Sequence, residues 1–272
     1  MHETNMLTLA IRLARQAGAL IAQQRRSLSV SFKGDTELVT QADVAADRLI
    51  TEGILGIYPE HQILSEELNP EQATDAEHLW IIDPIDGTVN FAHMHPQVAV
   101  SIAYYHKGKA RLGVVHNPFL DETFHAQAGK GARLNDLPIH VSKTTELRRA
   151  LIATGFPYVR DDLPLLMRRL QNVMEVCADV RRLGSAALDI CWVACGRLDG
   201  YYESVKPWDF AAAQLIAREA VATSAHIHPL SDGINPELCG DNLLITTPAL
   251  FSGLQQVLQQ AEQLSSPQRQ HA

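Results

Sequence analysis

The most informative part of the chain is the segment Leu79-Trp-Ile-Ile-Asp-Pro-Ile-Asp-Gly-Thr-Val-Asn-Phe91. Its apolar first part is typical of a buried strand, and it runs into two aspartates three positions apart. Pro84 fixes its own φ and has no N–H, so we expect the strand to stop there and the turn to bring Asp83 and Asp86 to the same side. Two carboxylates this close repel each other unless a cation lies between them.

The chemistry of this segment suits a hard cation beside an anion. Carboxylate oxygens are typical ligands of Mg²⁺ and Mn²⁺, and the carbonyl of Ile85 is a further candidate ligand. Gly87 allows close approach of the backbone, and a helical turn starting here would present the N–H groups of Gly87 and Thr88 to an anion. The segment therefore predicts a metal–phosphate site. The alternative is a strand end with surface aspartates.

Two other acidic positions could join this site. Glu66-Glu67 follows the strand-like Gln62–Leu64, so one glutamate would face the same crevice; a solvated acidic loop is the alternative. Pro207 and Trp208 precede Asp209, which we predict as the N-cap of a helix over 209–222. A capping carboxylate can also face a metal, although it can equally be only a cap.

Composition limits the class of protein. The chain has 272 residues, 46% of them hydrophobic, and a net charge of −8, which indicates one large or two small globular domains and argues against a general nucleic-acid binder. No run reaches the roughly 18 apolar residues of a membrane helix, and Arg12 and Arg15 interrupt the N-terminal apolar pattern. The four cysteines are too few for a disulfide framework. We expect a cytoplasmic protein without membrane contacts.

Periodicity predicts a mixed α/β protein. Helical spacing covers the ranges 4–26, 40–57, 161–176, 184–195, 209–222 and a segment from Ala249. Strand-like patterns cover the ranges 63–64, 79–82, 98–105, 112–116, 123–126, 200–203, 226–229 and 243–246. A central run of strands with helices before and after it indicates layered packing, and the tail after residue 265 is expected to fray.

In these motifs the chain resembles the inositol monophosphatase family of Mg²⁺-dependent, lithium-sensitive phosphatases. The matching segments are Leu38–Asp43, Glu66-Glu67, Trp80–Phe91, Gly184–Ala187, Asp199–Glu203 and Trp208–Ala213. The resemblance implies a layered α-β-α-β-α sugar-phosphatase fold, a homodimer, and one domain over residues 1–272, with possible sub-domains at about 1–140 and 141–265.

The same resemblance implies roles for individual residues. Two or three Mg²⁺ ions, for which Mn²⁺ can substitute, would be held by Glu66, Asp83, the Ile85 carbonyl, Asp86 and Asp209. The implied catalytic groups, which orient the attacking water, are Glu66, Thr88 and Asp43. The implied substrate contacts are Asp86, Gly87, Thr88, Ser185, Ala186, Glu203 and Asp209. Gly87 and Thr88 would bind the phosphate through backbone N–H groups.

The implied reaction is hydrolysis of a small phosphate monoester, with myo-inositol 1-phosphate as the leading substrate, by metal-activated water and without a phosphoenzyme. Histidinol phosphate, fructose 1,6-bisphosphate and adenosine 3′,5′-bisphosphate are alternative substrates of the same fold. A regulatory protein that binds RNA or RNA polymerase is the alternative from another class. The complete carboxylate set and the net charge of −8 favour the enzyme.

The sequence departs from the family pattern at three places. Ser65 replaces a usual glycine, and the segment after Glu219 lacks paired glycines. The stretch from Glu203 to Asp209, which holds implied substrate contacts, is one residue shorter than the family pattern. Outside these motifs, we expect buried cysteines at 191 and 195, and surface or loop histidines at 93, 95, 226 and 228. Lys206 is a candidate for the rim of the site.

Overall fold

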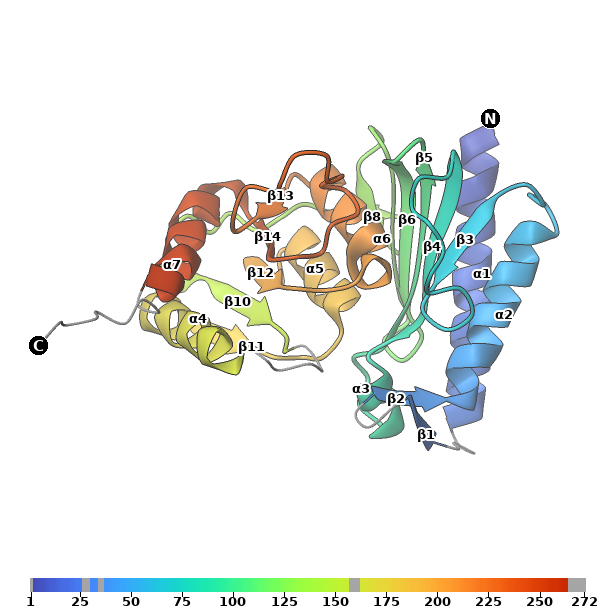
Figure 1. Ribbon diagram of the computed structural model, residues 1–272, viewed down its shortest axis with the longest axis horizontal. Helices are drawn as coiled ribbons and strands as arrows, with labels where there is room; N and C mark the ends of the chain where they lie inside the picture. Colours follow the sequence, from blue (N-terminus) through green and yellow to red (C-terminus); the bar gives the residue numbers. More distant parts are fainter. Residues whose placement is uncertain (1, 26–29, 34–36, 157–161, 264–272) are drawn as a thin grey trace, which may run out of the picture.

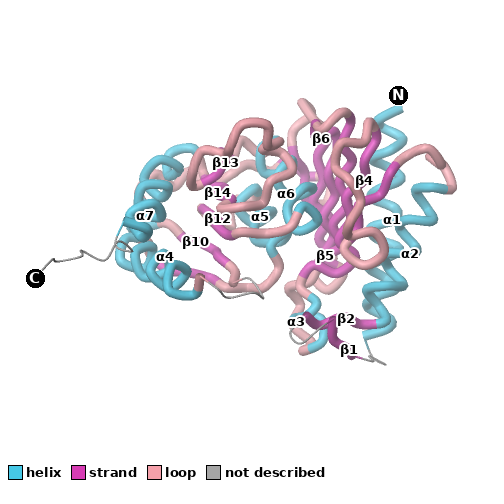
Figure 2. Tube along the Cα trace, in the orientation of Figure 1, coloured by secondary structure: helices cyan, strands magenta, loops and turns pink. Residues whose placement is uncertain are grey.

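The computed structural model describes residues 2–25, 30–33, 37–156 and 162–263. These residues form five layers (Figure 1), in which helices α1 and α2, a large sheet, helices α5 and α6, a second sheet, and helices α4 and α7 follow one another. This is the predicted α-β-α-β-α arrangement. Figure 2 shows the same alternation of helical and strand layers.

The first two layers form the N-terminal half. Its larger helices are α1 (His2–Gln24) and α2 (Gln41–Leu55), and a two-stranded ribbon of β1 (Val30–Lys33) and β2 (Glu37–Thr40) connects them. The strands of the large sheet lie in sequence order: β3 (Gln62–Ser65), β4 (His78–Asp86), β5 (Ala99–His106), β6 (Lys109–Asn117), β7 (Glu122–Gln127), β8 (Ala132–Leu134) and β9 (Leu137–Pro138). Only β3 and β4 pair in parallel within this sheet. The short helix α3 (Thr88–Ala92) follows β4.

The other layers come from the C-terminal half. The second sheet has the order β11-β10-β12-β14-β13, with the strands β10 (Leu151–Thr154), β11 (Asp179–Arg181), β12 (Gly200–Glu203), β13 (Thr223–His226) and β14 (Leu243–Thr246). Helices α5 (Ala186–Ala194) and α6 (Pro207–Glu219) lie between the sheets, and α4 (Leu163–Val176) and α7 (Phe251–Gln263) cover the outer face. One apolar cluster includes Leu79 and Tyr105 of the first sheet and Tyr201 and Ile245 of the second.

Small residues allow the middle helices to lie close to the first sheet. A Cβ on Gly113 of β6 would lie 2.5 Å from the carbonyl oxygen of Ala212 on α6. Ala211, Ala212 and Ala213 are all buried, which explains the run of alanines after Asp209 by close packing. This contact holds the amino-terminal half of α6, which carries Asp209, close to the large sheet.

Some local predictions were wrong. Pro84 does not stop the strand, because β4 continues to Asp86 through a bulge: Asp83 pairs with Ser101 and Asp86 with Ala99, so two residues oppose one and no ladder bond requires a proline N–H. The strand predicted at 226–229 lies at Thr223–His226. Residue 161, the first of the predicted helix 161–176, and the whole tail after 265 lie outside the described residues. No helix in the described ranges is long and apolar enough to cross a membrane.

Candidate active site

A cleft of about 250 Å³ opens between the two halves of the chain. One wall comes from the carboxyl end of β4 and the start of α3. The opposite wall comes from the ends of β10 and β12 and from the loop before α5. Predicted site residues that line the cleft are Glu66, Asp83, Ile85, Asp86, Gly87, Thr88, Ser185, Ala186, Glu203 and Asp209. Of the predicted metal ligands, catalytic groups and substrate contacts, only Asp43 is not a lining residue, and it lies directly behind Thr88.

Three carboxylates meet in this cleft. One oxygen from each of Asp83, Asp86 and Asp209 lies within 4.8 Å of the other two. Burial, followed by the negative charges of Glu66, Asp86 and Asp209, raises the pKa of Asp83 well above its ordinary value. Burial and the charge of Asp86 likewise raise the pKa of Asp209. An all-oxygen set of mutually repelling carboxylates fits a hard divalent cation such as Mg²⁺.

The carboxylate of Asp86 is held by the first turn of α5. It accepts hydrogen bonds from the Ser185 hydroxyl at 2.6 Å and from the N–H groups of Ala187 at 2.7 Å and Ala186 at 3.2 Å. A helix N-terminus favours such an anion. Burial nevertheless raises the pKa of Asp86 to about 6. Ser185 and Ala186, which the resemblance presents as substrate contacts, therefore position a metal-ligand candidate as well as lining the cleft.

Asp209 occupies a different helical position from the predicted one. It is the third residue of α6, with Lys206 as the N-cap, so the prediction that Asp209 itself caps the helix was wrong. One carboxylate oxygen of Asp209 accepts the Lys206 N–H at 2.8 Å. The side chain thus pairs a backbone N–H group at the start of the helix, and it also reaches the carboxylate cluster. Lys206 is exposed and is not among the residues that line the cleft.

The predicted Thr88–Asp43 pair is present. The Thr88 hydroxyl lies 3.2 Å from Asp43 Oδ1 and 3.0 Å from the Ile85 carbonyl oxygen, so it can donate to either. Asp43 Oδ2 accepts the Thr40 N–H at 2.9 Å, which caps α2 and fixes the carboxylate. Burial raises the pKa of Asp43.

The turn after β4 requires glycine. Gly87 has a φ of +95°, a region that side chains rarely adopt, and a Cβ there would lie 2.8 Å from the Gln97 carbonyl and 3.0 Å from that of Gly184. Asn90 fixes the same turn because its amide donates to the carbonyls of Gln97 at 2.9 Å and Leu183 at 2.7 Å. The asparagine in the Thr88–Phe91 segment therefore links α3 to the loop that leads into α5.

Two further anchors were missed by the sequence analysis. The Arg25 guanidinium donates to the carbonyls of Phe91 at 2.9 Å, Asn90 at 3.0 Å and His95 at 2.6 Å, which holds α3 in place. Asp47 on α2 accepts the N–H groups of Glu67 at 3.3 Å and Leu68 at 3.1 Å and so fixes the loop that carries Glu66. Neither residue lies in a motif, and each acts on a segment far away in the sequence.

The opposite wall contains Glu203 and a glycine that makes room for it. The Glu203 carboxylate accepts the Tyr201 hydroxyl at 2.6 Å, and burial raises the pKa of Glu203 to about 7. A Cβ on Gly155 would overlap this carboxylate, so the glycine creates the space that Glu203 occupies. Gly155 was not predicted, because only the fold brings the end of β10 beside the end of β12.

Asp189, Arg182 and Phe156 also line this wall and were missed. Asp189 is buried, and its Oδ1 has no hydrogen-bond partner among the described residues. Burial, followed by the charges of Asp86 and Glu203, raises the pKa of Asp189 well above its ordinary value. Its position one helical turn after Ser185 is the signal that could have revealed it.

The expectations for residues outside the motifs had mixed outcomes. Cys191 is buried and Cys195 partly buried, as predicted, and burial raises the pKa of both thiols. His93 and His95 are exposed, but the prediction of a surface position for His226 was wrong: it is buried, with Nδ1 2.8 Å from the Asp241 carbonyl oxygen.

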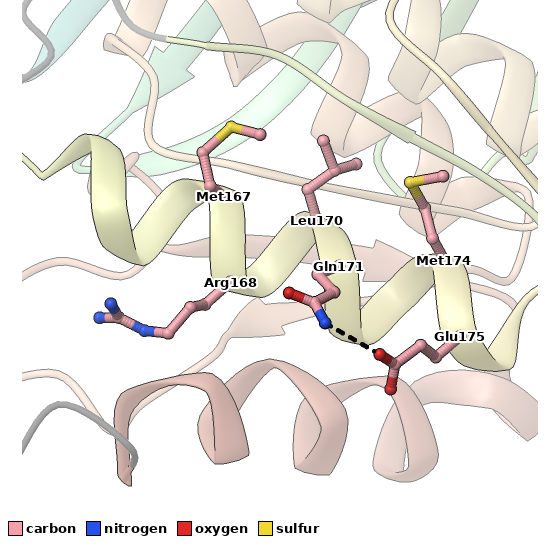
Figure 3. A pocket seen from close by; sticks show the side chains of 6 residues that line it. All are labelled: Met167, Arg168, Leu170, Gln171, Met174 and Glu175. Atoms are coloured by element: carbon pink, nitrogen blue, oxygen red, sulfur yellow. Dashed lines mark hydrogen bonds between the residues drawn. The ribbon is translucent and has the colours of Figure 1, made fainter.

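A second hollow lies on helix α4, away from the carboxylates (Figure 3). The side chains of Met167, Leu170 and Met174 stand along one side of the helix, beside Arg168, Gln171 and Glu175. The only acidic side chain drawn there, Glu175, accepts a hydrogen bond from Gln171 at 3.1 Å. This apolar hollow offers no set of groups for phosphate chemistry.

The five layers and the carboxylate cluster define a protein of the sugar-phosphatase fold. The sequence model of the inositol monophosphatase family matches residues 2–260, and the chain belongs to that family. The Nus factor SuhB of Pasteurella multocida is 44% identical over 220 residues, which cover 79% of this chain and 82% of that protein. The Nus factor SuhB of Escherichia coli K12 is 42% identical over the same shares of the two chains.

Solved structures agree with the fold. An inositol monophosphatase from Anabaena (Nostoc) has a TM-score of 0.84 at 35% identity, and the match covers 96% of this chain and 97% of that one. An IMPase from Thermotoga maritima has a TM-score of 0.85 at 30% identity, with coverage of 96% and 99%. SaIMPase-II with inositol monophosphate bound has a TM-score of 0.80 at 27% identity, with coverage of 96% and 97%.

Proposed function

We propose that this protein hydrolyses small phosphate monoesters in a Mg²⁺-dependent reaction, with myo-inositol 1-phosphate as the leading substrate. The observation that carries the proposal is the meeting of Asp83, Asp86 and Asp209 beside the Gly87–Thr88 turn. Uncatalysed hydrolysis of such esters is among the slowest reactions known, so a site for it needs concentrated positive charge. The inositol monophosphate bound to SaIMPase-II supports this choice of ester.

The metal would be held by Asp83, Asp86 and Asp209, with Glu66 and the Ile85 carbonyl completing an all-oxygen set. Bound Mg²⁺ supplies the charge that acidifies water and stabilises the leaving alkoxide. The first turn of α5 keeps the Asp86 carboxylate oriented through Ser185. The fixed loop after β3 does the same for Glu66.

Thr88 and Asp43 orient the attacking water. When the Thr88 hydroxyl donates its proton to Asp43 Oδ1 across 3.2 Å, the lone pairs of its oxygen are free to accept a hydrogen bond from the water. The water then attacks phosphorus in line, and no residue becomes phosphorylated. The N–H groups of Gly87 and Thr88 bind the phosphate oxygens at the start of α3.

Carboxylates on the opposite wall recognise the alcohol. Glu203 and Asp189 are hydrogen-bond acceptors that suit the hydroxyl groups of a polyol, and Glu203 is fixed by Tyr201. Ser185, Ala186 and Asp209 lie between this wall and the metal ligands. These carboxylates suit the hydroxyl groups of a small polyol phosphate, and they would repel the second phosphate of fructose 1,6-bisphosphate or adenosine 3′,5′-bisphosphate and find fewer hydroxyl groups on histidinol phosphate.

The test is phosphate release from these four esters with and without Mg²⁺, and with added Li⁺. We expect Mg²⁺-dependent release with the highest kcat/KM for myo-inositol 1-phosphate, and inhibition by Li⁺. A preference for another ester would retain the metal chemistry and reject the substrate. Release that is equal with and without Mg²⁺ would contradict the proposal.

A second candidate function rests on the identity of 42–44% to proteins named Nus factor SuhB. We propose regulatory binding to RNA or RNA polymerase as the alternative. It is tested by capturing either partner with the wild type and with Asp83→Asn. Equal capture by both forms, with no ester hydrolysed by the wild type, favours regulation over catalysis. Absence of capture rejects it.

We also propose that the chain forms a homodimer and folds as one domain. Exposed side chains on α4 recur at helical spacing, with Leu163 43%, Met167 49% and Met174 62% exposed and Leu170 between them (Figure 3). A second copy would cover this apolar stripe. Sedimentation of the wild type should give a dimer, and the Met167→Glu/Met174→Glu variant should shift toward the monomer. A monomeric wild type would contradict the dimer.

A further inference from the structure

Three histidines form a row across the amino end of β4. His78 on β4 pairs directly with His106 on β5. His61 immediately precedes β3, whose first residue Gln62 pairs with Leu79. The imidazole rings of His61 and His78 stack at 4.5 Å and 10°, and those of His78 and His106 at 5.0 Å and 14°. Figure 1 shows β3, β4 and β5 side by side in the large sheet.

A carboxylate completes this group. One ligand atom from each of Glu77, His78 and His106 lies within 4.8 Å of the other two. Glu77 Oε1 is 3.6 Å from His106 Nε2 and 3.3 Å from Lys107 Nζ. Lys107 is 68% exposed on its side chain, and an ion pair in that setting contributes little. A bound cation can therefore displace it from Glu77.

Neighbouring aromatic residues determine which ring nitrogens are available. The Trp80 indole N–H donates to His61 Nδ1 at 3.0 Å, so this lone pair is occupied and His61 serves as a stacking neighbour. His78 Nδ1 lies 2.7 Å from the Tyr104 hydroxyl, to which it can donate, leaving Nε2 with a free lone pair. Such a donated N–H is the usual outer support of a metal-bound histidine. Trp80 and Tyr104 are themselves buried.

We propose that Glu77, His78 and His106 bind a borderline divalent transition metal such as Zn²⁺. Two imidazoles and one carboxylate suit Zn²⁺ and leave a fourth position for water, whereas Mg²⁺ prefers oxygen ligands only. A Zn–N distance of about 2.1 Å requires the ligand atoms to close by about 1 Å. Glu77 is exposed, and His78 and His106 are partly exposed at the paired ends of β4 and β5, so their side chains can rotate that far.

This site is separate from the carboxylate cluster. Asp83 follows His78 by five positions along β4, which is about 17 Å at 3.3 Å per residue. The bound ion would link the paired ends of β4 and β5. It would not replace Mg²⁺ in the cleft.

The test is a titration with Zn²⁺ as the probe, in saturating Mg²⁺, on the folded wild-type chain and five single variants. We expect His78→Gln and His106→Gln to weaken Zn²⁺ binding at least tenfold. The matched control His61→Phe keeps a stacking ring and should bind as the wild type does, and so should Asp83→Asn. Glu77→Gln changes a side chain that is 60% exposed, so it should leave the fold unchanged, and it should also weaken binding.

Three results would overturn the site. One is a wild type that binds Zn²⁺ no more tightly than His78→Gln and His106→Gln. Another is loss of Zn²⁺ binding in Asp83→Asn, which would place the ion in the cleft. The third is unchanged binding in Glu77→Gln together with loss in His61→Phe, which would assign different ligands.

Discussion

The two walls of the cleft are built in different ways. On the wall from the large sheet, Asp83, Ile85, Asp86, Gly87 and Thr88 come from one continuous segment that passes from β4 into α3. On the opposite wall, single residues come from separated segments, which are Gly155-Phe156, Arg182, Asp189 and Glu203. The candidate metal ligands thus centre on one segment, which Glu66 and Asp209 join from elsewhere, whereas the proposed substrate wall depends on how the second sheet packs.

The largest expected effect is a loss of kcat when a candidate metal ligand on the wall from the large sheet is replaced. Asp83→Asn removes a central metal-ligand candidate and should lower kcat for myo-inositol 1-phosphate by at least about 10³-fold. Far-UV circular dichroism should be unchanged, because the substitution also relieves repulsion among buried carboxylates. Steady-state kinetics over a range of Mg²⁺ concentrations measures this. A kcat within tenfold of the wild type would remove Asp83 from the metal site.

The next effect compares one glycine on each wall. Gly87→Ala places a side chain at a φ of +95° and against two carbonyls, so kcat should fall about 100-fold and stability by about 1–3 kcal/mol. Gly155→Ala instead displaces the Glu203 carboxylate, so KM should rise while kcat changes little. Kinetics and thermal unfolding of the two variants provide the comparison. The same loss of kcat in both variants would contradict the assignment of catalysis to one wall and substrate binding to the other.

Glu203→Gln should have a smaller effect on catalysis. The variant keeps the shape of the side chain and its contact with Tyr201. It removes the negative charge and replaces one acceptor oxygen with an NH2 group, so hydrogen bonds from substrate hydroxyl groups are weakened. We expect KM for myo-inositol 1-phosphate to rise about tenfold, equivalent to about 1.4 kcal/mol, with less change for an ester that has no neighbouring hydroxyl. KM for both esters is the measurement. An equal change for both would show that Glu203 does not select the alcohol.

The smallest expected effect is on stability. The folded pKa values of Asp86, about 6, and Glu203, about 7, lie above their ordinary values of 3.8 and 4.5. For acids with raised pKa values, the stabilising contribution is complete below the ordinary pKa and is lost as the pH rises through the folded pKa. Without metal, Tm should therefore fall by about 5 °C between pH 4.5 and 7.5.

Metal should offset this loss, because it binds the deprotonated carboxylates. Mg²⁺ should raise Tm more at pH 7.5 than at pH 4.5. Thermal unfolding at both pH values checks this, with Asp83→Asn as the control that responds less to Mg²⁺. A Tm that rises with pH in metal-free buffer would contradict the raised pKa values.

The residues of the wall that is continuous in sequence line one cleft, as their spacing predicts. Asp83, Asp86, Gly87 and Thr88 are neighbours, so their chemistry could be inferred from spacing and from the known repulsion of carboxylates. The layered fold followed from the family resemblance and from the order of helical and strand patterns. Pro84 misled the local prediction, because a bulge absorbs the missing N–H and lets β4 continue.

On the other wall, the resemblance pointed to Ser185, Ala186 and Glu203, but Gly155, Arg182 and Asp189 could not be predicted, because they join the site only through packing. Gly155 matters because it leaves space for the Glu203 carboxylate, and the two residues are neighbours only because β10 pairs with β12. In the sequence, Asp189 is one polar residue in an apolar helix. Its place at the cleft follows only from the position of α5 between the two sheets. Arg25 likewise acts on carbonyls more than 60 positions away.

The most direct test of the proposed metal site is a crystal structure of the protein, from crystals grown with Mn²⁺, in which the metal is located by anomalous scattering. We predict an anomalous peak between the carboxylates of Asp83, Asp86 and Asp209, with metal–oxygen distances of about 2.1–2.2 Å. An empty carboxylate cluster in crystals of a protein that still hydrolyses phosphate esters in Mn²⁺ would contradict the assignment of these three aspartates as metal ligands.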